Sequence, residues 1–136
     1  MLDNDKKRLL VDRAIRAREM SYSPYSGFAV GAALLTRDGR IYTGANIENA
    51  SYTPTVCAER VALFTAIHSG ERDFVAIAIV GGEKGHPVSR FCPPCGVCRQ
   101  VMTEFCAPDL AVLLSDGESI REHTLGELLP AQFDLL

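Results

Sequence analysis

The sequence predicts an α/β fold in which a mixed sheet carries helices on its faces. Helix-like and strand-like patterns alternate in the order α-β-β-α-β-α-β-β-α, which is typical of layered α/β proteins. Residues 74–80 are apolar at nearly every position, as expected for a central strand covered on both faces. Asp38-Gly39, a strong hairpin signal, lies between the strand patterns 29–35 and 40–45. With the two strands near the C-terminus, these patterns predict a sheet of five strands.

The helices are expected from apolar spacing and from their end signals. Residues 5–20 have helical periodicity that ends before the loop 22–28, which is rich in turn-forming and aromatic residues. A second helix is expected from about Cys57 to Gly70, where glycine can form a left-handed cap. A loop over 81–87 then leads to a third helix, which opens at the second cysteine pair.

The C-terminal part predicts two more strands and a short helix. The strands are expected at 110–114 and 119–123, joined by an Asp-Gly turn. Thr124 and Glu127 form a capping-box pattern for a last helix that stops at Pro130. The sequence has no repeat, linker or low-complexity segment, so residues 1–136 are expected to form one domain.

Composition excludes several classes of function. The net charge of −3 and the pI near 5.6 argue against a polynucleotide-binding face, which would normally be basic. No apolar run approaches the roughly 20 residues that cross a bilayer, and the N-terminus lacks the order of a signal peptide. Five cysteines, an odd number, favour reduced thiols and metal binding over a disulfide framework. We therefore expect a cytoplasmic protein without membrane or nucleic-acid partners.

A split motif carries the chemistry. Its first part is Cys57-Ala58-Glu59-Arg60, and its second part contains Cys95 and Cys98 within PCGVCRQ. Three thiolates leave the fourth position of a tetrahedral zinc open, which is the catalytic arrangement. Glu59 follows a ligand by two residues and is placed to handle the protons of a water there, as in zinc deaminases.

The thiolate charge needs an offset if zinc is to act as a strong Lewis acid. Both cysteine groups open helices, whose N-termini carry partial positive charge and stabilise thiolates. Arg60 lies on the first turn beside Cys57 and is expected to donate to a ligand sulfur. The alternative for Arg60 is a surface salt bridge.

Other interpretations of the cysteines exist. A single CxxC is a weak signal that redox pairs and half zinc ribbons share. Cys92 could complete a closed four-cysteine structural site, although Glu59 would then have no role. We expect Cys92 to be a spare thiol and Cys106 a small buried hydrophobe. The three histidines show no ligand spacing.

Over nearly its whole length the chain resembles cytidine deaminases of the short, homotetrameric, zinc-dependent type. The matching stretches are YSPYSGFAVGAAL (22–34), NIENA (46–50), CAER (57–60), PCGVCRQ (94–100), and ELLP (127–130) followed by Phe133. The additional Cys92 is the one departure. The resemblance implies a three-layer α/β/α fold and hydrolysis of cytidine and 2′-deoxycytidine to the uridine product and ammonia, as in pyrimidine salvage.

The resemblance also implies roles for single residues. It makes Cys57, Cys95 and Cys98 the ligands of one zinc per chain and Glu59 the proton shuttle. The substrate contacts that it implies are Phe28 on the pyrimidine ring, Asn46 and Glu48 on the ribose hydroxyl, the backbone of Ala58 on the base, and Tyr52 and Phe133 at subunit contacts near a neighbouring site. The implied assembly is a homotetramer with shared active sites.

Three alternatives compete with this interpretation. A tRNA or polynucleotide deaminase is disfavoured by the acidic pI and by the polar cluster 46–49, which suits a free sugar. A deaminase of blasticidin S has a similar length, but by resemblance it should lack the Asn-Ile-Glu-Asn stretch. A non-catalytic zinc-binding scaffold would have no reason to keep Glu59.

Overall fold

A computed structural model shows the predicted α/β fold, and it describes residues 2–135. Its elements in chain order are α1 (Asn4–Ala17), the short 3-10 helix η1 (Arg18–Met20), β1 (Phe28–Thr36), β2 (Ile41–Ala45), α2 (Ala58–His68), β3 (Phe74–Glu83), α3 (Gly96–Phe105), β4 (Ala111–Ser115), β5 (Ile120–Thr124) and α4 (Leu125–Leu128). The five strands form one sheet in the order β2-β1-β3-β4-β5. The predicted fold class and element order are confirmed.

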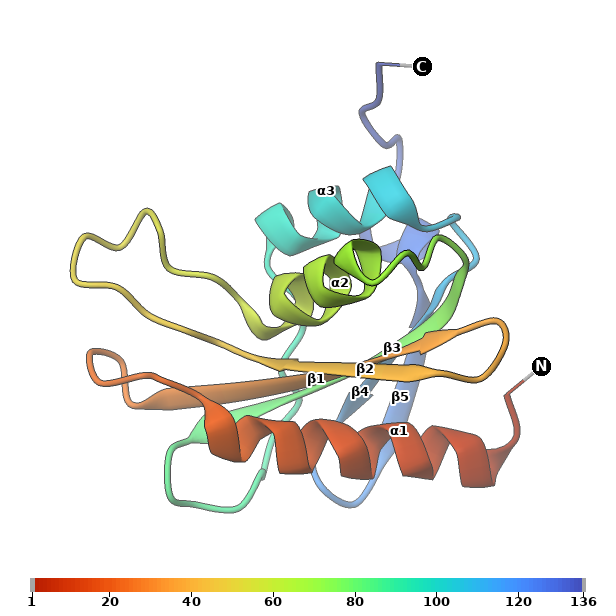
Figure 1. The fold of residues 1–136 in the computed structure, drawn as a ribbon. Helices are drawn as coiled ribbons and strands as arrows, with labels where there is room; N and C mark the ends of the chain where they lie inside the picture. Colours follow the sequence, from red (N-terminus) through yellow and green to blue (C-terminus); the bar gives the residue numbers. More distant parts are fainter. Residues whose placement is uncertain (1, 136) are drawn as a thin grey trace.

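The sheet is mixed, as predicted. β1 runs antiparallel to both β2 and β3, β4 runs antiparallel to β5, and only β3 and β4 are parallel. α1 covers one face of the sheet, whereas α2 and α3 cover the other (Figure 1). The parallel pair is joined by a crossover through α3, as parallel strands require.

Two apolar clusters fill the space on either side of the sheet, and β3 contributes to both. Ile77 and Ile79 belong to the cluster under α2 and α3. Ala76, Ala78 and Val80 belong to the cluster under α1. Because successive side chains of a strand point to opposite faces, a strand covered on both sides needs apolar residues throughout. This explains the unbroken apolar run predicted to be central.

Gly44 allows α2 to lie directly on β2. A Cβ atom there would stand 2.5 Å from the backbone nitrogen of Ala62 and 2.6 Å from the carbonyl oxygen of Ala58. Both contacts involve backbone atoms, so no side chain could move aside to accommodate a larger residue. The close approach fixes the start of α2, and with it Cys57, against the sheet.

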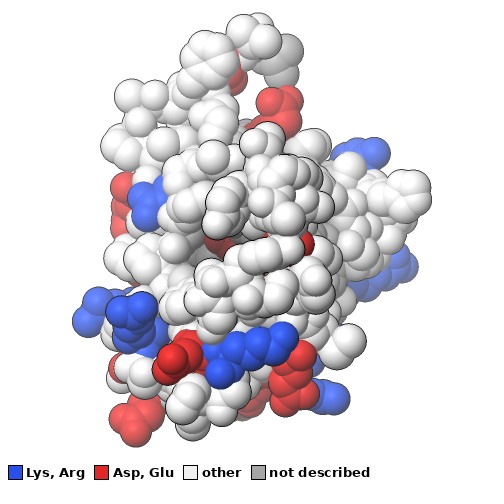
Figure 2. Space-filling model, turned by 90° about the vertical axis from the view of Figure 1, so that its left-hand side faces the viewer, with Lys and Arg blue, Asp and Glu red and all other residues white. Residues whose placement is uncertain are grey.

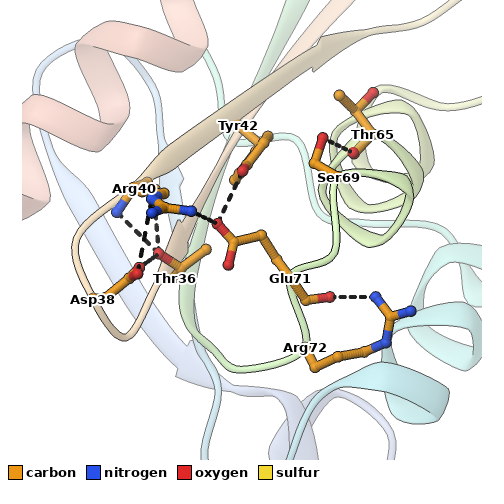
Figure 3. A network of polar contacts seen from close by, with 8 residues as sticks. All are labelled: Thr36, Asp38, Arg40, Tyr42, Thr65, Ser69, Glu71 and Arg72. Carbon is orange, nitrogen blue, oxygen red and sulfur yellow. Dashed lines mark hydrogen bonds and ion pairs between the residues drawn. The ribbon is translucent and has the colours of Figure 1, made fainter.

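The hairpin between β1 and β2 is tied to the end of α2 (Figure 3). Thr36 Oγ1 accepts a hydrogen bond from the backbone nitrogen of Arg40 at 2.9 Å. Glu71, just beyond α2, accepts from the Tyr42 hydroxyl at 2.9 Å and from Arg40 Nη1 at 3.3 Å. Gly39 at the turn has φ +95°, in agreement with the hairpin signal.

One boundary predicted from the sequence is wrong. The sequence predicts a loop at Gly81 and Gly82, but they belong to β3, where they pair with Val30 and Ala29 of β1. Glycine usually weakens a strand, so local propensity indicated a loop. Here the absence of a side chain is required, because the Cys92 thiol would lie 2.7 Å from a Cβ at Gly81.

The predicted ends of α2 and α4 are confirmed. Gly70 follows α2 with φ +96°. Thr124 caps α4 by accepting a hydrogen bond from the backbone nitrogen of Glu127 at 3.2 Å. Within residues 2–135, no helix combines the length and the apolar character that crossing a bilayer requires.

Candidate active site

The two cysteine motifs meet at one end of the sheet. Cys57 is the N-cap residue of α2, Cys95 is the N-cap residue of α3, and Cys98 lies in the first turn of α3. The three Sγ atoms lie within 4.8 Å of one another, and those of Cys57 and Cys95 are 3.9 Å apart. Both helices start at this end of the molecule (Figure 1).

The geometry of the three thiols fits zinc. Tetrahedral coordination with Zn–S bonds of about 2.3 Å separates two sulfur ligands by roughly 3.8 Å. Cys57, Cys95 and Cys98 form the only such group of three metal-binding side chains found within residues 2–135, so a fourth position is open. Cys92 lies outside this group. The arrangement corresponds to a catalytic site and differs from a closed four-cysteine site.

The pKa values of two of the thiols favour a thiolate that can bind a cation. A hydrogen bond from Cys98, followed by one from Arg60, lowers the pKa of Cys57 to about 5. The same interaction with Cys57, together with burial, raises the pKa of Cys98. One thiolate is therefore stabilised by its neighbour's proton, which a metal ion would displace on binding.

Arg60 lies beside the ligand set. Its Nη2 atom donates to Cys57 Sγ at 3.4 Å. None of the ion pairs within residues 2–135 includes Arg60. Its Nε atom is buried and has no hydrogen-bond acceptor in the described chain. The geometry therefore favours a partner of the ligand sulfur over the surface salt bridge.

Glu59 is the most unusual side chain of the site. It is only 4% exposed, and its Oε1 atom is buried without a hydrogen-bond partner among the described residues. Burial raises its pKa to about 7, with the negative charge of Cys57 adding to the effect. A buried carboxyl oxygen normally has a partner. The missing partner and the near-neutral pKa suit a group that exchanges protons with a ligand.

Asn46 braces the start of β1. Its Oδ1 atom accepts from the backbone nitrogen of Val30 at 2.9 Å and from the Ser21 hydroxyl at 2.5 Å. Its Nδ2 atom donates to the carbonyl oxygen of Phe28 at 2.8 Å. The side chain thus fixes the residue predicted to face the base. Its ribose contact stays a prediction, and its amide nitrogen has a second hydrogen for that purpose.

Glu48 braces the loop that precedes Phe28. Its Oε1 atom accepts from the backbone nitrogens of Tyr25 and Ser26 at 3.0 and 3.1 Å, and its Oε2 atom accepts from the Ser26 hydroxyl. The Ser26 hydroxyl is the main cause of the lowered pKa of Glu48. A carboxylate has about four lone-pair sites, so the predicted ribose contact remains open to it.

Phe28 and Cys92 both pack close to Gly81. A Cβ at Gly81 would lie 3.0 Å from Phe28 Cε2 as well as 2.7 Å from Cys92 Sγ. Burial raises the pKa of Cys92 to about 11, and the charge of Glu59 adds to the shift. Cys92 is therefore a protonated thiol near neutral pH. Sequence reasoning missed the place of Cys92 near Gly81, because its only signal was the CxxC that overlaps the metal motif.

The remaining predicted substrate residues differ in placement. Ala58, the first residue of α2, is fully buried. Tyr52 is 74% exposed in the 46–57 loop and has φ +59°. Phe133 is 67% exposed in the segment after α4, which extends away from the sheet past α3 (Figure 1). Tyr52 and Phe133 are thus not buried against their own chain.

The surface at this end is largely uncharged. Figure 2 shows the end of the molecule from which α2 and α3 start, with acidic atoms visible inside a hollow and basic residues mainly toward the periphery. A polyanion would require clustered Lys and Arg along its path. The face suits a small neutral ligand better.

Comparison with known proteins agrees with this geometry. Residues 4–114 match the family described as "Cytidine and deoxycytidylate deaminase zinc-binding region". A cytidine deaminase from Halalkalibacterium halodurans is 55% identical over 128 residues, which cover 93% of each chain. A crystal structure of cytidine deaminase from Burkholderia pseudomallei superposes with a TM-score of 0.83 at 48% identity, covering 93% of this chain and 98% of the other. A less similar relative, blasticidin-S deaminase from Bacillus cereus, is 35% identical over 111 residues, or 76% of each chain.

Proposed function

This chain belongs to the cytidine and deoxycytidylate deaminase family, and we therefore propose that it hydrolyses cytidine to uridine and ammonia. We extend the proposal to 2′-deoxycytidine, which differs only in the ribose. One observation carries it: the three thiols that fit zinc lie beside a buried carboxyl group whose Oε1 atom has no partner in the described chain.

Cys57, Cys95 and Cys98 would hold the zinc ion. When bound, zinc supplies a Lewis acid that makes hydroxide available at neutral pH. Helix N-termini at Cys57 and Cys95 offset part of the thiolate charge. Arg60 offsets more of it by donating to Cys57.

Glu59 moves the protons. It takes a proton from the attacking water and delivers it to N3 of the cytosine ring, which makes C4 electrophilic. The water oxygen bonds to C4, and Glu59 then carries that water's second proton from the new C4 hydroxyl to the amino group as the C4–N4 bond breaks and the C4 carbonyl forms. Water and cytidine thus give uridine and ammonia. A positioned acid–base group of this kind typically contributes about 10²–10⁴-fold.

We propose the same binding residues that the family resemblance implies. Phe28 packs on the pyrimidine ring, and the backbone of Ala58, at the N-terminal end of α2, holds the base. Asn46 and Glu48 contact the ribose hydroxyl while they brace the strand and loop around Phe28. These hydrogen bonds support the proposal, because a binding site that is already rigid loses little conformational entropy when substrate binds.

We further propose a homotetramer with shared active sites, in which Tyr52 and Phe133 approach a neighbouring site. Phe133 and Leu135 are 67% and 89% exposed, and Gln132 Nε2 is buried without an acceptor in the described chain. An apolar tail of this kind needs a docking surface. A second subunit would cover the apolar side chains and provide an acceptor.

The five cysteines indicate that the protein works in a reducing compartment. All five are free, and the three ligands must remain reduced to bind metal. We propose that residues 1–136 act as one domain in the cytoplasm, with a nucleoside as substrate and without nucleic-acid or membrane partners.

The test is the loss of ultraviolet absorbance near the cytidine band when zinc-loaded protein is mixed with cytidine. Parallel reactions with 2′-deoxycytidine and blasticidin S address the choice of substrate, since one relative acts on the latter by name. We expect turnover of both nucleosides and little of blasticidin S. Zinc-loaded protein without turnover of any of the three would leave the scaffold alternative.

A further inference from the structure

Two residues of the second cysteine motif have no part in the proposed chemistry. Arg99 and Gln100 directly follow Cys98 in α3. Both side chains donate to backbone carbonyls of the C-terminal segment, about 30 residues further along the chain: Arg99 Nη1 to Leu128 at 2.8 Å, and Gln100 Nε2 to Phe133 at 3.1 Å. They therefore hold this segment at two points five residues apart.

Arg99 also contacts the segment Pro94–Cys95, which we call the metal-binding loop. Its Nε atom donates to the carbonyl oxygen of Pro94 at 2.8 Å. Pro94 is buried, and its carbonyl belongs to the peptide bond that leads into Cys95. Fixing this peptide fixes the backbone from which a metal ligand projects. One guanidinium thus joins the Cys95 loop to the end of α4.

The chemistry of the contacts favours arginine at this position. Leu128 ends α4, a helix of four residues whose last carbonyls have no partner within the helix. A planar guanidinium can donate to two carbonyls at once in fixed directions, whereas an ammonium group is a single point of charge. Lysine would retain the charge and lose the bridge.

Gln100 acts on the residue with the proposed functional ring. Its contact is with the backbone of Phe133, whose side chain stays exposed. Because the backbone of Phe133 is held in place, its ring samples fewer positions. The conformational entropy lost when the ring docks on a neighbouring subunit is therefore smaller.

We propose that Arg99 and Gln100 are positioning residues that fix the C-terminal segment, and with it Phe133, relative to the metal-binding loop. This inference rests on the proposed function, in which Phe133 approaches a neighbouring site. The two cysteine ligands of α3 and the aromatic ring presented to the neighbour then share one rigid support. A substitution that loosens the C-terminal segment should therefore also affect the backbone at Cys95, and the reverse.

The experiment compares Gln100→Leu and Arg99→Lys with the wild type, each as full-length, zinc-loaded protein. Glu104→Gln, on the exposed side of the same helix, is the matched control. Amide exchange of residues 129–135, read by mass spectrometry, should accelerate about fivefold in Gln100→Leu, as one lost hydrogen bond implies. In Arg99→Lys the same exchange should accelerate, and zinc release to a chelator should rise about tenfold. The control should match the wild type in both readouts.

A double variant tests whether Gln100 acts through Phe133. With cytidine, Gln100→Leu should raise KM and leave kcat within about twofold, and kcat/KM of Gln100→Leu/Phe133→Ala should equal that of Phe133→Ala alone. Additive losses would overturn the inference. So would wild-type amide exchange in both Gln100→Leu and Arg99→Lys.

The outcomes separate this link from the shared site. If Phe133→Ala loses kcat/KM while Gln100→Leu alters neither exchange nor KM, the link is wrong and the shared site stands. If Gln100→Leu loosens the segment while Phe133→Ala keeps full kcat/KM, the link stands and the shared site is wrong.

Discussion

The two ends of α2 treat their acidic side chains in opposite ways. Beyond its C-terminal end, Glu71 accepts hydrogen bonds from Tyr42 and Arg40 (Figure 3). At its N-terminal end, Glu59 is nearly as buried as the apolar core, and its Oε1 atom has no partner in the described chain. The helix has 11 residues, so its two ends are about 16 Å apart. Glu71 finds hydrogen-bond partners within the protein, whereas Glu59 Oε1 requires a ligand as its partner.

This difference separates stability from function. A satisfied network fixes the hairpin and the helix end against one another and stabilises the fold. An unsatisfied buried carboxyl destabilises the fold and is retained where a ligand or a proton uses it. Substitutions at the two ends should therefore change different quantities.

The largest effect is expected from the metal ligands. Cys95→Ser replaces a thiolate by a hydroxyl, a much poorer ligand for zinc. We expect zinc to fall from one per chain toward none and deamination to fall below detection. Elemental analysis with an activity assay measures both. Cys92→Ser is the control, because Cys92 lies outside the cluster, and zinc loss there would contradict the ligand assignment.

Arg60→Gln should have a smaller effect than loss of a metal ligand. It removes a charged donor from Cys57 while keeping a side chain that can form hydrogen bonds. Partners of metal ligands are worth about 10–100-fold in activity or metal affinity, and we expect a loss of that size. Steady-state kinetics and chelator competition would reveal it. Unchanged values in both would return Arg60 to a surface role.

Phe133→Ala should reduce kcat/KM by roughly five- to a hundredfold, since base–aromatic stacking contributes about 1–3 kcal/mol. The expected loss depends on a second subunit, so the size of the protein in solution is measured in parallel. A chain ending at Pro130 should behave like Phe133→Ala. A fully active monomer would contradict the shared site.

Glu71→Gln should leave kcat unchanged and lower the free energy of unfolding by about 1–2 kcal/mol. Glu71 is 14% exposed at its side chain, and its hydrogen bonds to Tyr42 and Arg40 would lose the carboxylate charge or break. Denaturant unfolding and the deamination assay test the two halves separately. A variant of normal stability and reduced turnover would reverse the comparison between the helix ends.

The smallest effect concerns alkaline pH. The hydrogen bond to Glu71 raises the pKa of Tyr42 above its usual value of 10.0. A raised pKa in the folded state means that the stabilisation is complete below about pH 10 and is lost as pH rises toward the folded value. Wild-type protein should therefore lose its stability advantage over Tyr42→Phe in this range. A pH-independent difference in unfolding midpoint would argue against the contact.

Local patterns predicted most of the fold. Gly70 and Thr124 mark helix ends through chemistry within a few residues, so the sequence was sufficient there. The strand order β2-β1-β3-β4-β5 depends on contacts between distant segments, and no local pattern encodes it. Gly81 was misassigned for the same reason, because the thiol that requires a glycine lies eleven residues away.

The site shows a similar division. Cys95 and Cys98 are predictable because they have the short spacing of a metal-ligand pair. Cys57 lies 38 residues before Cys95 and is predictable only through Glu59, which follows it by two residues. The bracing by Asn46 and Glu48 was not found, since it joins the strand β1 and loop 22–28 to residues some 20 positions away. Exposure of Tyr52 and Phe133 depends on tertiary packing, which a sequence pattern does not specify.

The central claim is that Glu59 carries protons in a site that its thiols complete with zinc. Glu59→Gln keeps the size of the side chain and removes its ability to exchange protons. The most direct measurement is kcat for cytidine in this variant, together with its zinc content. We predict one zinc per chain, an unfolding midpoint at or above that of the wild type, and a kcat at least about a hundredfold lower. Near-normal turnover by the zinc-loaded variant would remove Glu59 from the mechanism and contradict the account.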